Sequence, residues 1–98
     1  MNQPLRCYMA SAIAEEVKRE IDQCEEHCGP FHSLLEGLAA LREEYNELEE
    51  AILWGVTESG DAKCVRSTAI QVAAVATRIA MMVSPVPVES ITPWEEDV

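Results

Sequence analysis

Two glutamates, Glu44 and Glu47, have the residue type and spacing to hold a metal ion. They lie in the run LREEYNELEEAI, and a separation of three residues on a helix places both carboxylates on one side, within reach of a shared cation. Hard divalent ions such as Mg²⁺ take oxygen ligands and are often held by a few carboxylates together with a substrate's phosphates. Without a cation, glutamates four residues apart in this run repel each other by roughly a few tenths of a kcal/mol per pair. The other interpretation is an acidic helix face in contact with water, which is what most such runs are.

A helix over residues 31–54 would position these carboxylates. It has an apolar stripe with the i, i+3/i+4 spacing of a helix buried on one side, formed by Leu34, Leu38, Leu41, Tyr45, Leu48 and Ile52. A second strip beside it combines small side chains with the two carboxylates and consists of Gly37, Ala40, Glu44, Glu47 and Ala51. Because small residues let a neighbouring helix approach closely, we expect this second strip to enclose the acids instead of leaving them in water.

A first helix is predicted over about residues 8–28, after a short lead-in that contains Pro4. Its apolar residues recur at threes and fours, with charged residues between them. Gly29-Pro30 ends it, because glycine is a common C-terminal cap and proline cannot continue the hydrogen-bond ladder. The short break implies that the next helix folds back antiparallel.

A third helix is predicted over about residues 64–83, and Ser84-Pro85 ends it. The sequence has no strand pattern and no internal repeat. It therefore predicts an all-α fold, an antiparallel bundle of three helices in a single domain over residues 1–83. Residues 84–98 form an irregular acidic tail, which we expect to dock, if at all, through Trp94.

The third helix is apolar almost all the way round, which is typical of a central helix or of half a subunit interface. Three helices of this kind carry more apolar surface than one small chain can cover. Contiguous exposed apolar surface usually marks an interface. We therefore expect a homo-oligomer, a dimer or a tetramer, with the third helix at or near the contact between copies.

The composition excludes several classes of protein. A formal net charge of −11 argues against binding nucleic acid through phosphate contacts, which needs clustered Lys and Arg. No stretch is long and apolar enough to span a bilayer, since the best candidate, residues 69–83, contains Gln71, Thr77 and Arg78. The N-terminus lacks the pattern of a signal peptide. The sequence thus predicts a cytoplasmic protein without a membrane partner, and its four cysteines are expected to be thiols.

A zinc site is not favoured, although five potential ligands occur in the chain, namely Cys24, His27, Cys28, His32 and Cys64. Zinc ligands usually flank a tight turn, as in Cys-x-x-Cys, and that spacing is absent. Cys24 and Cys28 also continue the apolar stripe of the first helix, where a buried thiol is ordinary.

The motif HSLLEGLAALREEYNELEEAI, followed by a loop and a helix reading TAIQVAAVATRIA, resembles the MazG-like members of the all-α NTP pyrophosphatase superfamily. The resemblance covers about residues 16–82. In that family a Glu-x-x-Glu pair on one helix and a Glu-x-x-Asp pair on a later helix hold Mg²⁺, and water attacks the bound triphosphate to release pyrophosphate and a nucleoside monophosphate. The resemblance implies that Glu44 and Glu47 are the first of these pairs, both catalytic and metal-binding, with Mg²⁺ as cofactor and Mn²⁺ as an alternative.

The second acidic pair of the family is not present, since Thr68 and Gln71 occupy its positions. Each has a neutral oxygen that can be at best a weak metal ligand. Glu36 and Glu43 are the candidates to replace the lost ligands, and Glu36 is also a candidate substrate contact. Arg78, two turns after Gln71 on the same face, could pair with a phosphate. The alternative for Arg78 is a place at a subunit interface or a charge reaching solvent.

Three functions therefore compete. The first is a Mg²⁺-dependent nucleoside triphosphate pyrophosphohydrolase in nucleotide-pool housekeeping. The second is a catalytically lapsed relative that binds a nucleotide or a partner protein, which the loss of the second acidic pair favours. The third, an acidic decoy for a basic nucleic-acid-binding surface, rests on net charge alone.

Overall fold

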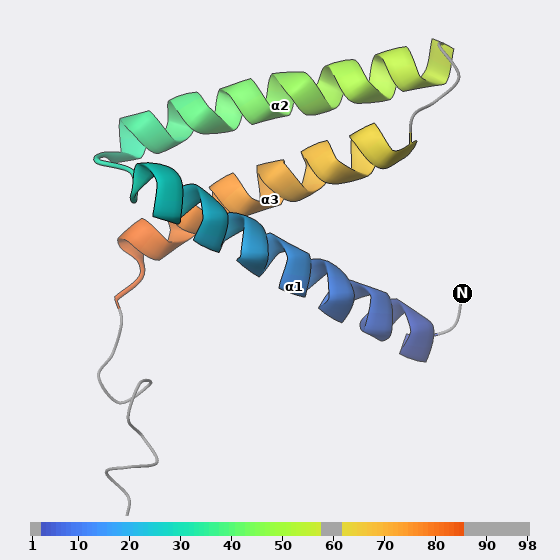
Figure 1. The fold of residues 1–98 in the computed structure, drawn as a ribbon, viewed down its shortest axis with the longest axis horizontal. Helices are drawn as coiled ribbons and strands as arrows, with labels where there is room; N and C mark the ends of the chain where they lie inside the picture. The colour runs from blue at the N-terminus through green and yellow to red at the C-terminus, as the bar shows by residue number, and fades with distance from the viewer. Residues whose placement is uncertain (1–2, 58–61, 86–98) are drawn as a thin grey trace, which may run out of the picture.

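The computed structural model describes residues 3–57 and 62–85, which form three α-helices (Figure 1). These helices are α1 (Gln3–Cys28), α2 (Leu34–Thr57) and α3 (Ala62–Val83). Neither described range contains a strand, so the predicted all-α fold of three helices is confirmed. Most of the predicted tail, including Trp94, lies outside the described residues.

The predicted lead-in before the first helix is wrong, because α1 begins at Gln3. Pro4 lies in its first turn, where the missing backbone N–H is no loss, since the first N–H groups of a helix have no partner within it. The last helical residue of α1 is Cys28, as predicted. Gly29 follows in a left-handed conformation, with φ of 76°, and donates its N–H to the carbonyl of Glu25 over 2.8 Å. This is the glycine-capped helix end that the sequence indicates.

The start of α2 is three residues later than predicted, because residues 29–33 make the turn. Ser33 caps the helix, since its Oγ accepts the N–H of Glu36 over 3.1 Å. The Glu36 carboxylate reaches back and accepts the N–H of His32 over 2.7 Å, an arrangement close to a capping box. The hydrogen bond from the His32 backbone lowers the pKa of Glu36, and the one from the His32 side chain lowers it further. The predicted role of Glu36 in a site therefore competes with its place at this helix start.

α3 lies at the centre of the fold. α2 runs antiparallel beside it, and α1 crosses it, so each of the outer helices packs against α3 (Figure 1). Among the described residues, the buried hydrophobic core consists of Ile21, Ile70, Ala74 and Val75. Three of these four residues belong to α3, and the buried polar residues Thr68 and Arg78 do as well.

The predicted burial of the apolar stripe of α2 is wrong. Four of its large side chains are 39–55% exposed, those of Leu34, Leu38, Tyr45 and Ile52. The strip of small residues faces α3 instead, with Gly37 buried and Ala40 and Ala51 half-buried. A Cβ placed on Gly37 would lie 2.9 Å from Cγ1 of Ile79 and 3.2 Å from Cδ2 of Phe31. The helices therefore approach where side chains are smallest, as expected for the second strip. Of the apolar stripe, Leu41 and Leu48 are half-buried and the other four residues are exposed.

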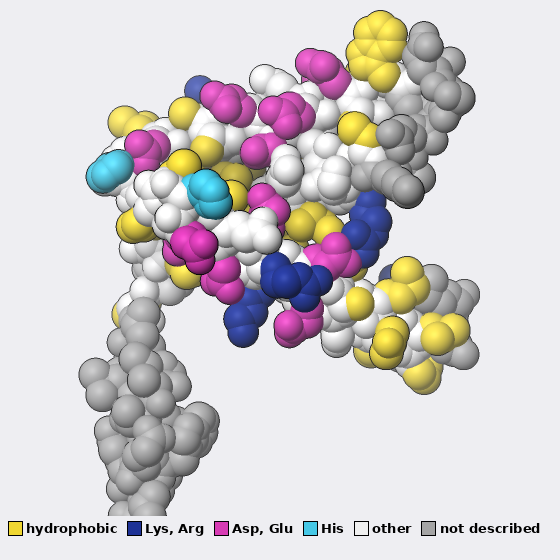
Figure 2. Space-filling model, viewed as in Figure 1, with side chains coloured by type: hydrophobic (Ala, Val, Ile, Leu, Met, Phe, Trp, Pro, Cys, Tyr) yellow, Lys and Arg dark blue, Asp and Glu magenta, His cyan; other side chains and the backbone are white. Residues whose placement is uncertain are grey.

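Apolar side chains are also exposed at the N-terminal end of α1, which extends beyond its crossing with α3 (Figures 1 and 2). Leu5, Tyr8 and Met9 lie here and are each more than half exposed. Within residues 3–57 and 62–85, no helix combines the length and the apolarity that crossing a membrane requires.

Candidate functional site

Glu44 lies on the side of α2 that faces α3 and is half-buried. Its Oε1 atom is buried and has no hydrogen-bond partner among the described residues. Desolvation raises the pKa of Glu44, and repulsion from Glu47 and then from Glu20 and Glu43 adds to it. A carboxylate oxygen that has lost water and gained no donor is costly while it is charged. The fold therefore disfavours the charged form of Glu44.

Glu47 lies one turn further along α2 and is exposed. It is close enough to Glu44 to share a hydrogen bond when Glu44 is protonated, and this contact contributes to the raised pKa of Glu44. The two carboxylates thus form a pair, as their spacing predicts. The expected enclosure of both acids is wrong for Glu47, which is open to water, while Glu44 is partly sheltered. Glu43, Glu49 and Glu50, the other acids of the run, are exposed.

The register between α2 and α3 places Thr68 and Gln71 level with this pair. The helices are antiparallel, and Gly37 meets Ile79, so a step forward along α2 matches a step back along α3. Glu44, seven residues after Gly37, is therefore level with Val72, seven residues before Ile79. Thr68 is therefore one residue from the level of Glu47, and Gln71 is one residue from the level of Glu44.

Thr68 and Gln71 differ in how available their oxygens are. Thr68 is buried, and its Oγ1 donates to the carbonyl of Cys64 over 2.6 Å, so its proton is committed to the backbone of α3. Gln71 is half-buried and lines a hollow of about 220 Å³ between α1 and α3. The amide of Gln71 is thus the more accessible of these two neutral groups.

Glu20 of α1 is an acid near the site that the sequence did not reveal. It lines the hollow that contains Gln71, and its charge raises the pKa of Glu44. Its position comes from the crossing of α1 over α3, which the bidentate ion pair between Arg66 and Glu16 also stabilises. The available signal was weak: Glu20 precedes Ile21 at the edge of the apolar stripe of α1, where a carboxylate is partly sheltered.

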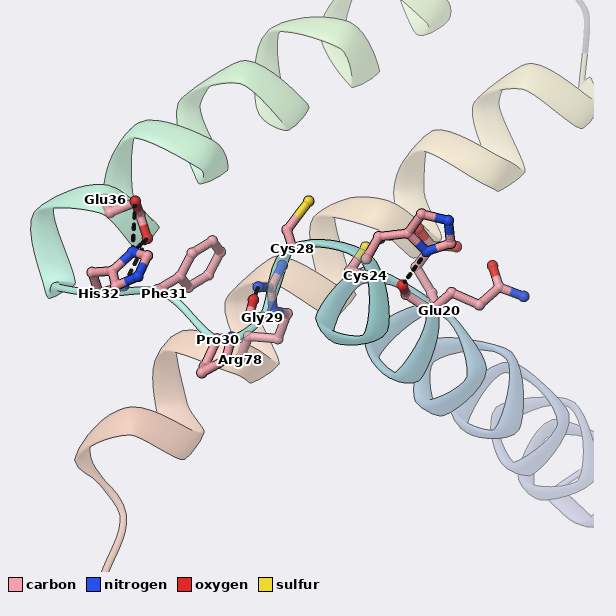
Figure 3. A pocket seen from close by; sticks show the side chains of 11 residues that line it. Glu20, Cys24, Cys28, Gly29, Pro30, Phe31, His32, Glu36 and Arg78 are labelled. Atoms are coloured by element: carbon pink, nitrogen blue, oxygen red, sulfur yellow. Dashed lines mark hydrogen bonds and ion pairs between the residues drawn. The ribbon is translucent and has the colours of Figure 1, made fainter.

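A cavity of about 470 Å³ lies where α1 ends and α2 begins (Figure 3). Cys24, Cys28 and Glu20 line it from α1, and Phe31 and His32 line it from the turn. It shares Glu20 with the smaller hollow, so the two depressions adjoin.

Arg78 forms the wall of this cavity on α3, and its guanidinium has partners within the chain. Its Nη2 donates to the carbonyl of Gly29 over 3.1 Å, and its Nε to Oε2 of Glu25 over 3.4 Å. Its guanidinium carbon lies 3.9 Å from the centroid of the Phe31 ring, a cation–π contact. Its side chain is 7% exposed. These contacts tie the end of α1 and the turn to α3, and they restrict how Arg78 could reach a phosphate.

A metal ion needs several ligand side chains that lie close together. Within residues 3–57 and 62–85, no three His, Cys, Asp or Glu side chains lie together as a preformed metal site. The thiol of Cys24 donates to Glu20 over 3.4 Å, and burial raises its pKa, so it is not the thiolate that zinc needs. Two carboxylates with one orphaned oxygen do fit Mg²⁺, which keeps several waters and often takes its remaining ligands from phosphates.

Comparisons of the chain with models of protein families, with curated proteins and with solved structures found no match.

Proposed function

We propose that the chain is a Mg²⁺-dependent nucleoside triphosphate pyrophosphohydrolase of the MazG-like kind, acting on the nucleotide pool. The observation that supports this proposal is the buried, unpartnered Oε1 of Glu44 next to the Glu47 carboxylate. A divalent cation would satisfy that oxygen and remove the repulsion between the two acids. On an acidic face fully in contact with water, no carboxylate oxygen would lack a partner, and no cation would be required to relieve the repulsion.

In this proposal Glu44 and Glu47 hold the ion, while substrate phosphates and water complete its coordination. Bound there, the ion would neutralise phosphate charge and assist the deprotonation of water. Water adds to the α-phosphorus, the bond from that phosphorus to the bridging oxygen breaks, and pyrophosphate leaves with the nucleoside monophosphate as the other product. In this proposal Gln71, which lines the hollow between α1 and α3, would contact a bound water or a phosphate oxygen.

The test is pyrophosphate release from a panel of standard and modified nucleoside triphosphates, with Mg²⁺ or Mn²⁺ and with a chelator. We expect metal-dependent release, and a loss of at least about 100-fold in kcat/KM for both Glu44→Gln and Glu47→Gln, because each variant removes a charge needed in the transition state. Glu50→Gln, an equivalent change at an exposed acid of the same helix, is the matched control. Activity that persists in Glu44→Gln would remove this site from the mechanism.

A second candidate function is a lapsed relative that binds a nucleotide without hydrolysing it. It is favoured by the two neutral residues opposite the acidic pair, and in particular by the Thr68 hydroxyl, whose proton is bonded to the helix backbone. Titration calorimetry with a nucleoside triphosphate and Mg²⁺ separates the candidates. Binding without pyrophosphate release would select the lapsed relative.

We also propose that the chain acts as a homo-oligomer. The support is the small size of the core, since just four hydrophobic residues are buried among those described. A chain of 98 residues is long enough for a larger core, so a core this small leaves apolar surface that a second copy could cover.

A further inference from the structure

The outer face of α2 is defined here by Leu38, Arg42, Tyr45, Glu49 and Ile52. These five residues follow one another at three- and four-residue steps, so they form a continuous strip along the helix. Its apolar members are 39–55% exposed, and Arg42 and Glu49 are exposed as well. An amphipathic helix usually buries such a strip. Within this chain the strip is left open, because the small residues of α2 occupy the contact with α3.

The charges on the outer face are arranged to complement themselves. Arg42 and Glu49 are seven residues apart, and their midpoint lies between Tyr45 and Asn46. Neither makes an ion pair within the described parts of the chain. If two copies of α2 lie antiparallel about a two-fold axis at that midpoint, Arg42 of each copy lies opposite Glu49 of the other. The same axis places Leu38 opposite Leu53 of the second copy, so an apolar contact flanks each ion pair.

The surface beside this midpoint is hollowed. A depression of about 410 Å³ is lined by Leu41, Arg42, Tyr45 and Asn46 of α2 and by Val72 of α3. Tyr45, one of the residues that line it, is 55% exposed. In an antiparallel pair, the Tyr45 side chain of each copy approaches the depression of the other. The depression, the charged pairs and the exposed apolar side chains thus all agree with the same two-fold axis.

We infer that the outer face of α2 pairs antiparallel with the same face of a second copy, with Arg42 of each chain against Glu49 of the other. Leu38, Tyr45 and Ile52 recur every seven residues on this face, which is the heptad spacing by which helices pair along their length. A partner of another sequence could cover the apolar residues, but only a second copy supplies the opposite charges through the same two positions. The pairing does not depend on the proposed hydrolase.

The test measures the mass of the full chain in solution at micromolar concentration, without nucleotide or metal. We expect the wild-type chain to be a dimer, and we expect Arg42→Glu and Glu49→Arg each to raise the dimer dissociation constant at least about tenfold, because each places two like-charged pairs in the interface. Glu50→Arg makes the same charge change as Glu49→Arg at an exposed position off the outer face, and it should leave the dimer unchanged.

Mixing the two variants gives the sharper result. In a mixed dimer, one chain presents glutamate at both positions and the other presents arginine at both, so both contacts again join opposite charges. We expect an equimolar mixture of Arg42→Glu and Glu49→Arg to form mixed dimers, which native mass spectrometry separates from the homodimers by mass. Recovery on mixing also shows that both variants are folded.

Three outcomes overturn the inference: a monomeric wild-type chain, single variants that dimerise as well as wild type, or a mixture that forms no more dimer than either variant alone. Because pyrophosphate release is not measured, failure here leaves the hydrolase proposal untouched. Loss of activity in Glu44→Gln likewise says nothing about the pairing.

Discussion

The two sides of α2 differ in side-chain size more than in polarity. The inner side carries Gly37, Ala40 and Ala51 around Glu44, and α3 packs against it. The outer side carries Leu38, Tyr45 and Ile52, which remain 39–55% exposed. Close approach of two backbones needs small residues, while large apolar residues can be buried by a more distant partner. This difference teaches that hydrophobicity alone does not decide which side of a helix enters the core.

The largest expected effect comes from enlarging the inner side. Gly37→Val should destabilise the fold by about 1–3 kcal/mol, because the new side chain meets Ile79 and Phe31 at less than contact distance. For a chain of this size that loss lowers Tm by about 4–8 °C per kcal/mol. Thermal unfolding followed by circular dichroism measures it. Ala39→Val, at an exposed position of the same helix, should change Tm far less. Equal effects of the two variants would mean that α3 does not approach at Gly37.

The next effect concerns the outer side. If a second copy covers it, the wild-type Tm rises with protein concentration, because association stabilises the folded state. Each tenfold rise in protein concentration adds about 1.4 kcal/mol to the stability of the dimer. Tyr45→Glu should abolish this dependence while costing the monomer little, since Tyr45 is exposed within its own chain. Tm measured across a hundredfold range of concentration tests both statements. A wild-type Tm that does not vary would count against a covered outer side.

The smallest effect concerns the acid on the inner side. The folded-state pKa of Glu44 is raised above 4.5, so its protonated form favours folding below that pH, and this contribution is lost as pH rises through the folded pKa. At pH 7 the charged form is penalised. Glu44→Gln should therefore raise Tm by about 1–3 °C at pH 7, and the gain should shrink as pH falls toward 4.5.

The Glu44→Gln variant also shows whether Glu44 is only a destabilising acid or a metal ligand. Adding Mg²⁺ should raise the Tm of the wild-type chain and leave that of Glu44→Gln unchanged, because only the wild type has a carboxylate pair for the ion. Glu50→Gln is again the control, and it should respond to Mg²⁺ as wild type does. A variant that loses activity while gaining stability would identify Glu44 as a residue kept for function.

Much of the fold could be predicted from residue spacing, and its errors have physical causes. Apolar periodicity located three helices, and Gly29 and Ser84 marked two of their ends. The start of α2 was placed too early because the capping role of Ser33 and Glu36 was not recognised. Periodicity shows which residues share a side of a helix. It does not show which side another helix will choose.

The candidate site likewise has one part that the sequence predicts and another that it does not. The pairing of Glu44 with Glu47 follows from their spacing on one helix, and sequence was sufficient to predict it. Glu20 could not be placed beside them, because its nearness depends on how α1 crosses α3. The partners of Arg78 were likewise out of reach, since they come from the turn and from the end of α1.

Gly29 and Gly37 lack a side chain for opposite reasons. At Gly29 nothing lies within 4 Å of where a Cβ would be, yet the positive φ disfavours an ordinary L-residue. The exclusion there is one of handedness, so a mirror-image alanine introduced by chemical synthesis would suit the turn and restrict the unfolded chain. At Gly37 the backbone is an ordinary helix and the exclusion is one of volume.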